Sequence, residues 1–199
     1  IGNSVFITYQ KQTDGSFKEL KQKNVDFGGG LERTLPALSN NPDIFTTDLY
    51  QPIIKELERV SVHKYGGAVD REFRIITDHI KAAVFLISDG VIPSNKDRGY
   101  ILRRLIRRSV RFGRTLGIES NFIKPAVGSA VKIYSEVYPE LLGNRKLIED
   151  TIENEESKFQ RTISSGLKEF NKISAKGKIS PQDAFFLYES FGFPYELIE

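Results

Sequence analysis

The stretch Pro93-Ser94-Asn95-Lys96-Asp97-Arg98 runs directly into Gly99-Tyr100-Ile101-Leu102-Arg103-Arg104-Leu105-Ile106-Arg107-Arg108-Ser109-Val110-Arg111-Phe112-Gly113-Arg114. At about 100° per residue, a helix here separates its side chains into two halves. One half is largely apolar and comprises Ile101, Leu102, Leu105, Ile106, Ser109, Val110 and Phe112. The other half comprises Arg103, Arg104, Arg107, Arg108, Arg111 and Arg114. We therefore predict a helix that buries its apolar half in a domain core and presents a guanidinium face.

This cationic half concentrates charge that the rest of the chain lacks. Residues 96–114 hold eight basic residues and one acidic residue, a net +7, whereas the whole chain carries +3, which leaves −4 for the remainder. Arginine's planar, permanently charged fork matches phosphate oxygens, so a nucleic-acid backbone is the natural partner. The alternative is a solvated helix whose arginines pair with acids elsewhere. A membrane surface is disfavoured, because helices of that kind carry exposed Trp, Phe or Leu and mainly lysine.

The composition narrows the class of protein further. The 199 residues suffice for one large or two small domains, and the lack of cysteine excludes disulfides, a thiolate nucleophile and a cysteine-ligated metal. With two isolated histidines, we expect no metal site. No run approaches the ~20 apolar residues that span a bilayer. We expect an intracellular protein without a membrane partner, in the cytoplasm or alternatively an organelle. Strand-like sequence begins at Ile1, which leads us to expect a piece of a longer protein.

The start of the chain predicts a β-hairpin that leads into a helix. Asn3–Gln10 is rich in β-branched and aromatic residues, and Asp14-Gly15 supplies a turn from which Phe17–Leu20 can pair back. Within Asn24–Arg33, a short strand then meets three glycines and the start of a helix. Such glycines let a ligand approach the backbone, and a helix N-terminus offers N–H groups to an anion. The alternative is plain turn chemistry.

The remainder of the chain predicts helices. A helix over Leu31–Leu38 contains Pro36, so it is either short or kinked. Other helical patterns cover about Ile53–Val60 after a Thr46 or Thr47 cap, Asp70–Ser88, Ala126–Val137, Leu147 to about Phe170, and an aromatic segment with Ser180 as cap and Pro181 at the first position. We interpret most of the acids of the long helix as a solvated face: Glu149, Asp150, Glu153, Glu155 and Glu156. The predicted fold class is α+β, mainly α, with a small antiparallel β piece followed by a helical domain.

The order and spacing of three segments carry a resemblance over nearly the whole chain: Val25–Arg33, Asp78–Arg111 and Ala184–Pro194. They resemble, in turn, motif 3, the helical tRNA-recognition region and the segment that closes that region in alanyl-tRNA synthetases, a family of class II aminoacyl-tRNA synthetases. The resemblance implies that residues 1–40 are the C-terminal part of a class II catalytic domain. Residues 41–199 would form a helical domain that recognises the acceptor stem.

This resemblance implies a ligase that activates alanine with ATP and Mg²⁺ and transfers it to tRNA(Ala). The in-line displacement at the α-phosphate depends mainly on positioning and charge neutralisation. Arg33 would be the catalytic residue, which holds the γ-phosphate of ATP. The alanine ammonium would contact Asp26, whose carboxylate suits a cation, and Asn3. The other implied substrate-binding positions are Val5 at the methyl pocket and the glycines Gly28 and Gly30.

The resemblance also implies that a G·U wobble pair of the acceptor stem is read through an asparagine and an aspartate. Asn95 stands at the asparagine position, and its amide can donate and accept at base edges. Glu189 stands where the family has the aspartate, and its extra methylene moves the carboxylate by about a bond length. Phosphates of the stem would contact Arg98, Arg103, Arg104, Arg107, Arg108 and Arg111.

Further expectations concern what the chain does alone. The family's motifs 1 and 2 would precede Ile1 and its editing domain would follow Glu199, so we expect that residues 1–199 do not activate alanine by themselves. Two other hypotheses stay open. One is a stand-alone, non-catalytic RNA-binding module. The other is a helical interaction domain whose arginines meet an acidic protein, or the Glu149–Glu156 face of its own long helix.

Overall fold

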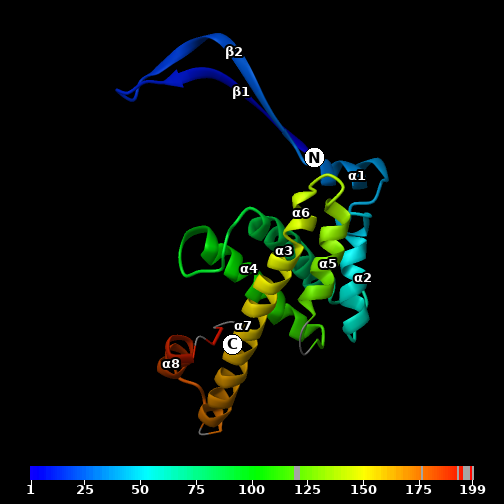
Figure 1. Cartoon of the computed structure of the whole chain (residues 1–199). Coiled ribbons are helices and arrows are strands. Elements are labelled where there is room, and N and C mark those ends of the chain that lie inside the picture. Colours follow the sequence, from blue (N-terminus) through cyan, green and yellow to red (C-terminus); the bar gives the residue numbers. More distant parts are fainter. Residues whose placement is uncertain (119–121, 176, 192, 195–197, 199) are drawn as a thin grey trace. The chain divides into compact units, whose positions relative to one another are not determined.

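The computed structural model describes residues 1–118, 122–175, 177–191, 193–194 and 198 (Figure 1). The chain divides into two compact units, Ile1–Gln51 and Pro52–Glu199. The first unit holds a β-hairpin, a short helix and a loop, and the second unit holds helices. This arrangement confirms the predicted fold class. No helix within the described ranges is long and apolar enough to cross a membrane.

The hairpin pairs β1 (Gly2–Lys11) with β2 (Phe17–Gly29) as an antiparallel sheet of two strands. Its turn lies at the predicted Asp14-Gly15 pair. Gly15 has a φ of +86°, a left-handed conformation that glycine adopts without strain. An Asp14 carboxylate oxygen accepts from the Ser16 hydroxyl at 2.7 Å and from the Ser16 N–H at 2.9 Å, and these two hydrogen bonds hold the pKa of Asp14 below its usual value.

Strand β2 is longer than the sequence pattern predicts. Gly28 pairs with Asn3 and Gly29 pairs with Gly2, so the ladder continues through two of the three glycines. A Cβ at Gly2 would lie 2.9 Å from the Phe27 ring, and a Cβ at Gly29 would lie 3.1 Å from it. These glycines therefore make room for an aromatic ring, and the change of direction occurs after them.

The first helix, α1 (Leu31–Leu38), has the predicted bounds. It is short, which is one of the two outcomes that Pro36 predicts. Pro36 falls in the last turn, and the helix ends two residues later, at Leu38. Beyond the end, the N–H and the hydroxyl of Ser39 both donate to the Leu35 carbonyl, at 3.1 and 2.8 Å.

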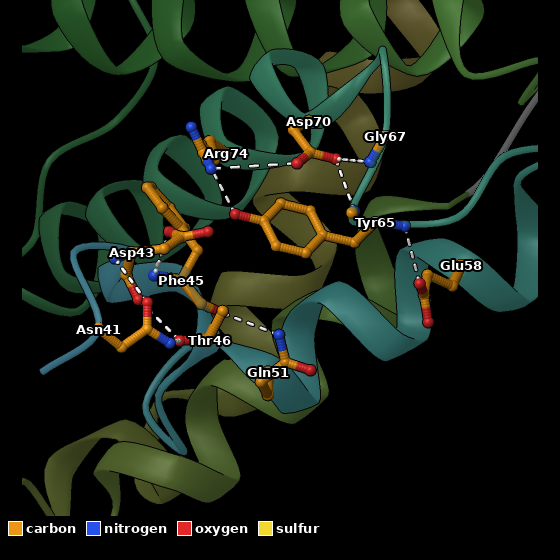
Figure 2. A network of polar contacts seen from close by, with 11 residues as sticks. Asn41, Asp43, Phe45, Thr46, Gln51, Glu58, Tyr65, Gly67, Asp70 and Arg74 are labelled. Atoms are coloured by element: carbon orange, nitrogen blue, oxygen red, sulfur yellow. Dashed lines mark hydrogen bonds and ion pairs between the residues drawn. The ribbon is translucent and has the colours of Figure 1, made fainter. Parts of the chain in front are cut away.

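A loop with a 3₁₀ turn, η1 (Ile44–Thr46), completes the first unit. Asn41 organises this loop, because its side chain donates to the Thr46 hydroxyl at 2.8 Å and accepts from the Asp43 N–H at 3.0 Å (Figure 2). The Gln51 amide donates to the Phe45 carbonyl at 2.9 Å. The hydroxyls of Thr46 and Thr47 donate to the Asp43 and Ile44 carbonyls, and α2 begins only at Gln51, so the predicted cap by Thr46 or Thr47 is wrong.

Among the described residues, the second unit contains seven helices. They are α2 (Gln51–Val60, whose first residue belongs to the first unit), α3 (Asp70–Ser88), α4 (Asp97–Thr115), α5 (Ile123–Tyr134), α6 (Glu140–Gly143), α7 (Arg145–Ser174) and α8 (Pro181–Phe191). Helix α3 has the predicted bounds and contacts α4, α5 and α7, so it lies at the centre of the unit (Figure 1). Its predicted apolar stripe is buried, from Phe73 to Ile87.

The turn before α3 is held by side chains of its own unit. Asp70 accepts from the Gly67 N–H at 2.7 Å, and the Tyr65 N–H donates to Glu58 at 2.9 Å (Figure 2). Arg74, one turn into the helix, donates to the Tyr65 hydroxyl at 2.7 Å. These bonds pair backbone N–H groups of the turn and hold Tyr65 against the first turns of α3.

Helix α4 buries the predicted side of its surface with one exception. Leu102, Ile106 and Val110 are buried, whereas Ile101 is 50% exposed. On a helical wheel with Ile101 at zero, the buried residues run from about 20° to about 180°. Ile101 therefore lies at the border of the buried arc, next to the arginines, and the prediction that it belongs to the core is wrong.

Helix α7 corrects the interpretation of its acids. Its apolar stripe is buried as predicted at Ile148, Ile152, Phe159 and Ile163. Glu155 and Glu156, however, are buried as well, because they lie on the side of α7 that packs against other helices. Only part of the predicted acidic face is therefore solvated.

The last helix, α8, begins as predicted. The Ser180 hydroxyl accepts from the Asp183 N–H at 3.1 Å, and the Asp183 carboxylate accepts from the Ser180 N–H at 2.9 Å, a reciprocal cap. After α8 the fully buried Phe193 packs on Gly166 of α7, where a Cβ would overlap its ring. This contact returns the chain to the helical core.

Candidate functional site

The helical unit carries an arginine cleft. It has a volume of about 220 Å³ and lies over α4, α7 and the α8 segment. Five of the predicted arginines line it together with aromatic residues: Tyr100, Arg103, Arg104, Arg107, Arg108, Arg111, Phe159, Tyr188 and Pro194. The arginines meet there because they share one face of α4. The packing of α7 and α8 then builds the opposite walls.

Arg107 contacts two residues of another helix. Its Nε donates to Glu155 Oε1 of α7 at 2.7 Å, with 30% of the arginine side chain and 8% of the glutamate side chain exposed. Its guanidinium also lies 5.0 Å from the centre of the Phe159 ring, which is one turn farther along α7. A charge-assisted hydrogen bond and a cation–π contact thus hold one arginine on two sides.

The neighbouring arginines rest on aromatic rings of their own helix. Arg111 lies 4.6 Å from the centre of the Phe112 ring, and Arg108 lies 5.9 Å from it. Arg103 lies 5.7 Å from the Tyr100 ring. Each of these guanidinium groups lies over an aromatic ring, a cation–π arrangement that limits the positions the side chain adopts.

Asn95 joins the cleft through Arg103, whose Nη1 donates to the Asn95 side-chain oxygen. Because an arginine only donates, the Asn95 amide turns its oxygen to Arg103 and keeps its NH₂ group for other partners. Arg98 is exposed in the first turn of α4 and does not line the cleft. Glu189 is exposed on α8, next to the cleft residue Tyr188.

The sequence analysis did not assign Tyr188, Pro194 or Phe159 to this site, and it considered Glu155 only as part of the Glu149–Glu156 face that could meet the arginines. Phe159 and Glu155 carried a usable signal, since they stand one turn apart on α7 and so lie on one helix face. Helix α7 packs against α4, and the 2.7 Å bond to Arg107 is part of this contact. No local sequence pattern predicts such a tertiary contact.

The hairpin of the first unit gathers four of the predicted substrate-binding residues. Asn3 pairs with Gly28 and Val5 pairs with Asp26 across the two strands. Opposite residues in an antiparallel pair lie on the same face, and so do residues two apart on one strand. All four therefore share one face of the hairpin. Both Val5 and Gly28 are exposed, and a Cβ at Gly28 would meet nothing within 4 Å.

Arg33 and Gly30 lie where the hairpin ends. Gly30 is the N-cap of α1, and its carbonyl accepts from the Arg33 N–H at 3.0 Å and the Thr34 N–H at 3.1 Å. A Cβ at Gly30 would lie 3.1 Å from Cδ of Arg33, so the glycine gives that side chain room. The Arg33 side chain is exposed in the first turn of the helix. Within the described residues, no group of three or more His, Cys, Asp or Glu could hold a metal ion.

Comparisons with known proteins identify the family of this chain. The family described as "tRNA synthetases class II (A)" matches residues 1–199. The alanine–tRNA ligase of Borreliella afzelii is 46% identical over 206 residues, which cover 100% of this chain and 35% of that protein. The alanine–tRNA ligase of Thermotoga maritima is 42% identical over 200 residues, 99% of this chain and 23% of that protein. The chain thus spans about a third or less of these relatives, and it belongs to the class II tRNA synthetases of that family.

Proposed function

We propose that this chain acts within an alanine–tRNA ligase, to which it supplies motif 3 and the recognition of the tRNA(Ala) acceptor stem. The single observation that carries the tRNA part is the arginine cleft, in which five arginines of one helix face line one concave surface. The similarity to alanine–tRNA ligases supports alanine as the amino acid. In this proposal residues 1–40 serve alanine activation and residues 41–199 serve the tRNA.

For alanine activation, the shared face of the hairpin supports the proposed roles. Asp26 would bind the alanine ammonium with Asn3 beside it, while Val5 would contact the methyl group and Gly28 would leave space. Arg33 would bind the γ-phosphate of ATP from the first turn of α1, where the helix dipole also favours an anion. Mg²⁺ bound to ATP would supply further neutralisation of the phosphate charge.

For the tRNA, the cleft would position the acceptor stem through its phosphates, while base edges would be read beside it. Arg103 engages the side-chain oxygen of Asn95, which favours an Asn95 NH₂ donor directed at an acceptor on the wobble pair. Glu189 would supply the acceptor on the other side. These contacts would set the register of the 3′ end for transfer.

Two hairpin RNAs test the recognition directly. Binding of the chain to an acceptor-stem hairpin with a G·U pair should be tighter than to a matched G·C hairpin, and Asn95→Ala should remove the difference. Binding to both should weaken linearly with salt on a log–log plot, because phosphate contacts release counterions. An absence of binding to either hairpin at low salt contradicts the proposal and favours an acidic protein as the partner of the arginines.

Alanine activation needs a separate test in a full-length ligase that carries this sequence. Arg33→Ala should abolish most ATP–pyrophosphate exchange, while the exposed Lys18→Ala on β2 should leave it unchanged. Unaltered exchange in Arg33→Ala would instead favour a non-catalytic RNA-binding module.

A further inference from the structure

The structure holds a buried acid beside the arginine cleft that the proposed function does not use. Glu155 of α7 has 8% of its side chain exposed, and its carboxylate accepts from Arg107 Nε at 2.7 Å. An acid at this place is unexpected in a surface for anions, because its charge opposes a phosphate. Simple electrostatics predicts that the cleft would bind phosphate more strongly without it.

We propose that Glu155 is a positioning residue for tRNA binding, which orients the Arg107 guanidinium so that its remaining donors face a phosphate in the arginine cleft. This inference rests on the proposed function of the cleft.

The geometry supports an orienting role. Glu155 engages Nε, which is one of the five N–H donors of the guanidinium, so four donors on the two terminal nitrogens remain for the ligand. The carbon of the same guanidinium lies over the Phe159 ring, 5.0 Å from its centre. A planar group that is held at Nε and against a ring has little rotational freedom left. The entropy cost of ordering the Arg107 side chain therefore arises on folding and not on binding.

Burial explains why the acid stabilises one orientation. A carboxylate that is removed from water needs a partner, and Arg107 is the partner that the structure gives Glu155. Swinging the arginine away would leave the buried charge unpaired. Arg107 is thus tied to α7, the opposite wall of the cleft, through a buried charge.

Two conservative variants separate orientation from charge. Glu155→Asp keeps the charge but withdraws the oxygen from Nε, whereas Glu155→Gln keeps an oxygen in reach and removes the charge. The proposal predicts that Glu155→Asp weakens binding to the acceptor-stem hairpin by about threefold to tenfold and lowers the salt slope by about one phosphate contact, as Arg107→Ala does. Glu155→Gln should keep the salt slope of the unaltered chain.

The control is Glu153→Gln, which removes a charge from the same helix at a half-exposed acid paired with Lys124 at 2.9 Å. It should leave both affinity and slope within about twofold of the unaltered chain. In the Arg107→Ala background, Glu155→Asp should have no further effect, because the two residues act as a unit.

The outcomes distinguish the two proposals. If Arg107→Ala weakens binding while Glu155→Asp binds with unchanged affinity and slope, the positioning role is overturned and the RNA function stands. If Arg107→Ala also leaves binding unchanged, the proposed function of the cleft fails instead. Circular dichroism checks the fold of each variant. Should Glu155→Asp unfold, Glu155→Gln decides, since a slope reduced as in Arg107→Ala would contradict the proposal.

Discussion

The two units of this chain are stabilised in different ways. In the hairpin unit the strands are joined by a backbone ladder, yet its large apolar side chains are exposed: Val5, Phe6, Ile7, Tyr9, Phe17, Val25 and Phe27. In the helical unit the large apolar side chains of α3, α4, α5 and α7 are buried against one another. The helical unit therefore has a core of its own, whereas hydrogen-bond register shapes the hairpin.

This difference also governs the two candidate sites. On the hairpin, strand alternation alone brings Asn3, Val5, Asp26 and Gly28 to one face. In the arginine cleft, the arginines of α4 face walls that come from distant parts of the sequence. A change in the helical core should thus affect its site, while a change in an exposed hairpin side chain should leave the fold intact.

The largest effect is expected from the core of α3. Phe73→Ala should destabilise the chain by about 3–5 kcal/mol, because it empties a fully buried site that also contacts the Tyr65 ring. The matched change Phe6→Ala, at a side chain that is 76% exposed, should alter the free energy of unfolding by no more than about 0.5 kcal/mol. Urea unfolding measures both. Equal losses would contradict the contrast between the units.

A glycine-to-alanine substitution in each unit tests the same contrast, with a smaller expected effect on stability. Gly166→Ala places a methyl group against the buried Phe193 ring, at a cost of about 1–3 kcal/mol. That exceeds the roughly 1 kcal/mol that alanine gains over glycine inside a helix, so we expect a net loss of stability. Gly28→Ala meets open space and should leave the unfolding midpoint unchanged. A Gly166→Ala midpoint equal to or above that of the unaltered chain would show that α8 repacks freely.

Replacing one cationic residue in each unit tests whether RNA binding depends on the arginine cleft. Arg104→Ala, at an exposed arginine of the cleft, should weaken binding of the hairpin RNA by several-fold and reduce its salt slope by about one contact. Lys18→Ala on β2 removes the same charge and should leave both values unchanged. Fluorescence anisotropy at several salt concentrations provides the measurement. If both variants lose affinity equally, binding follows net charge and not the cleft.

The smallest effect concerns acid stability. A hydrogen bond from His79 lowers the pKa of Asp78 on α3, and contacts with Ser16 lower the pKa of Asp14 in the hairpin turn. A carboxyl whose pKa is lowered by folding adds stability above its unfolded pKa and loses it as the pH falls through its folded pKa. The Asp78 side chain is 61% exposed, so solvent screens the contribution.

We therefore expect Asp78→Asn to be slightly less stable than the unaltered chain at neutral pH, and this difference should vanish once the pH falls below the lowered pKa of Asp78. Asp14→Asn should leave the unfolding of the helical core unchanged at every pH. Thermal unfolding between pH 2 and pH 7 tests both variants. A pH-independent difference for Asp78→Asn would show that the ion pair with His79 is not its cause.

Some of this molecule follows from local pattern alone. The apolar repeat of Asp70–Ser88 and the turn at Asp14-Gly15 are confirmed, because each depends on neighbours a few residues away in the chain. Local pattern was less reliable for positions at a boundary. Ile101 lies at the edge of the buried arc, and the glycines Gly28 and Gly29 continue the strand because they pair with Asn3 and Gly2.

The sequence by itself determined the arginine face of α4, since helical periodicity places those side chains together whatever surrounds them. Only the tertiary structure decided which arginines line a cleft and which one is held. Arg107 meets Glu155 across 48 positions of sequence because α7 packs against α4, and Glu155 becomes a buried partner instead of a solvated acid. Burial depends on how several helices pack together, and the sequence of one helix does not show which other residues cover it.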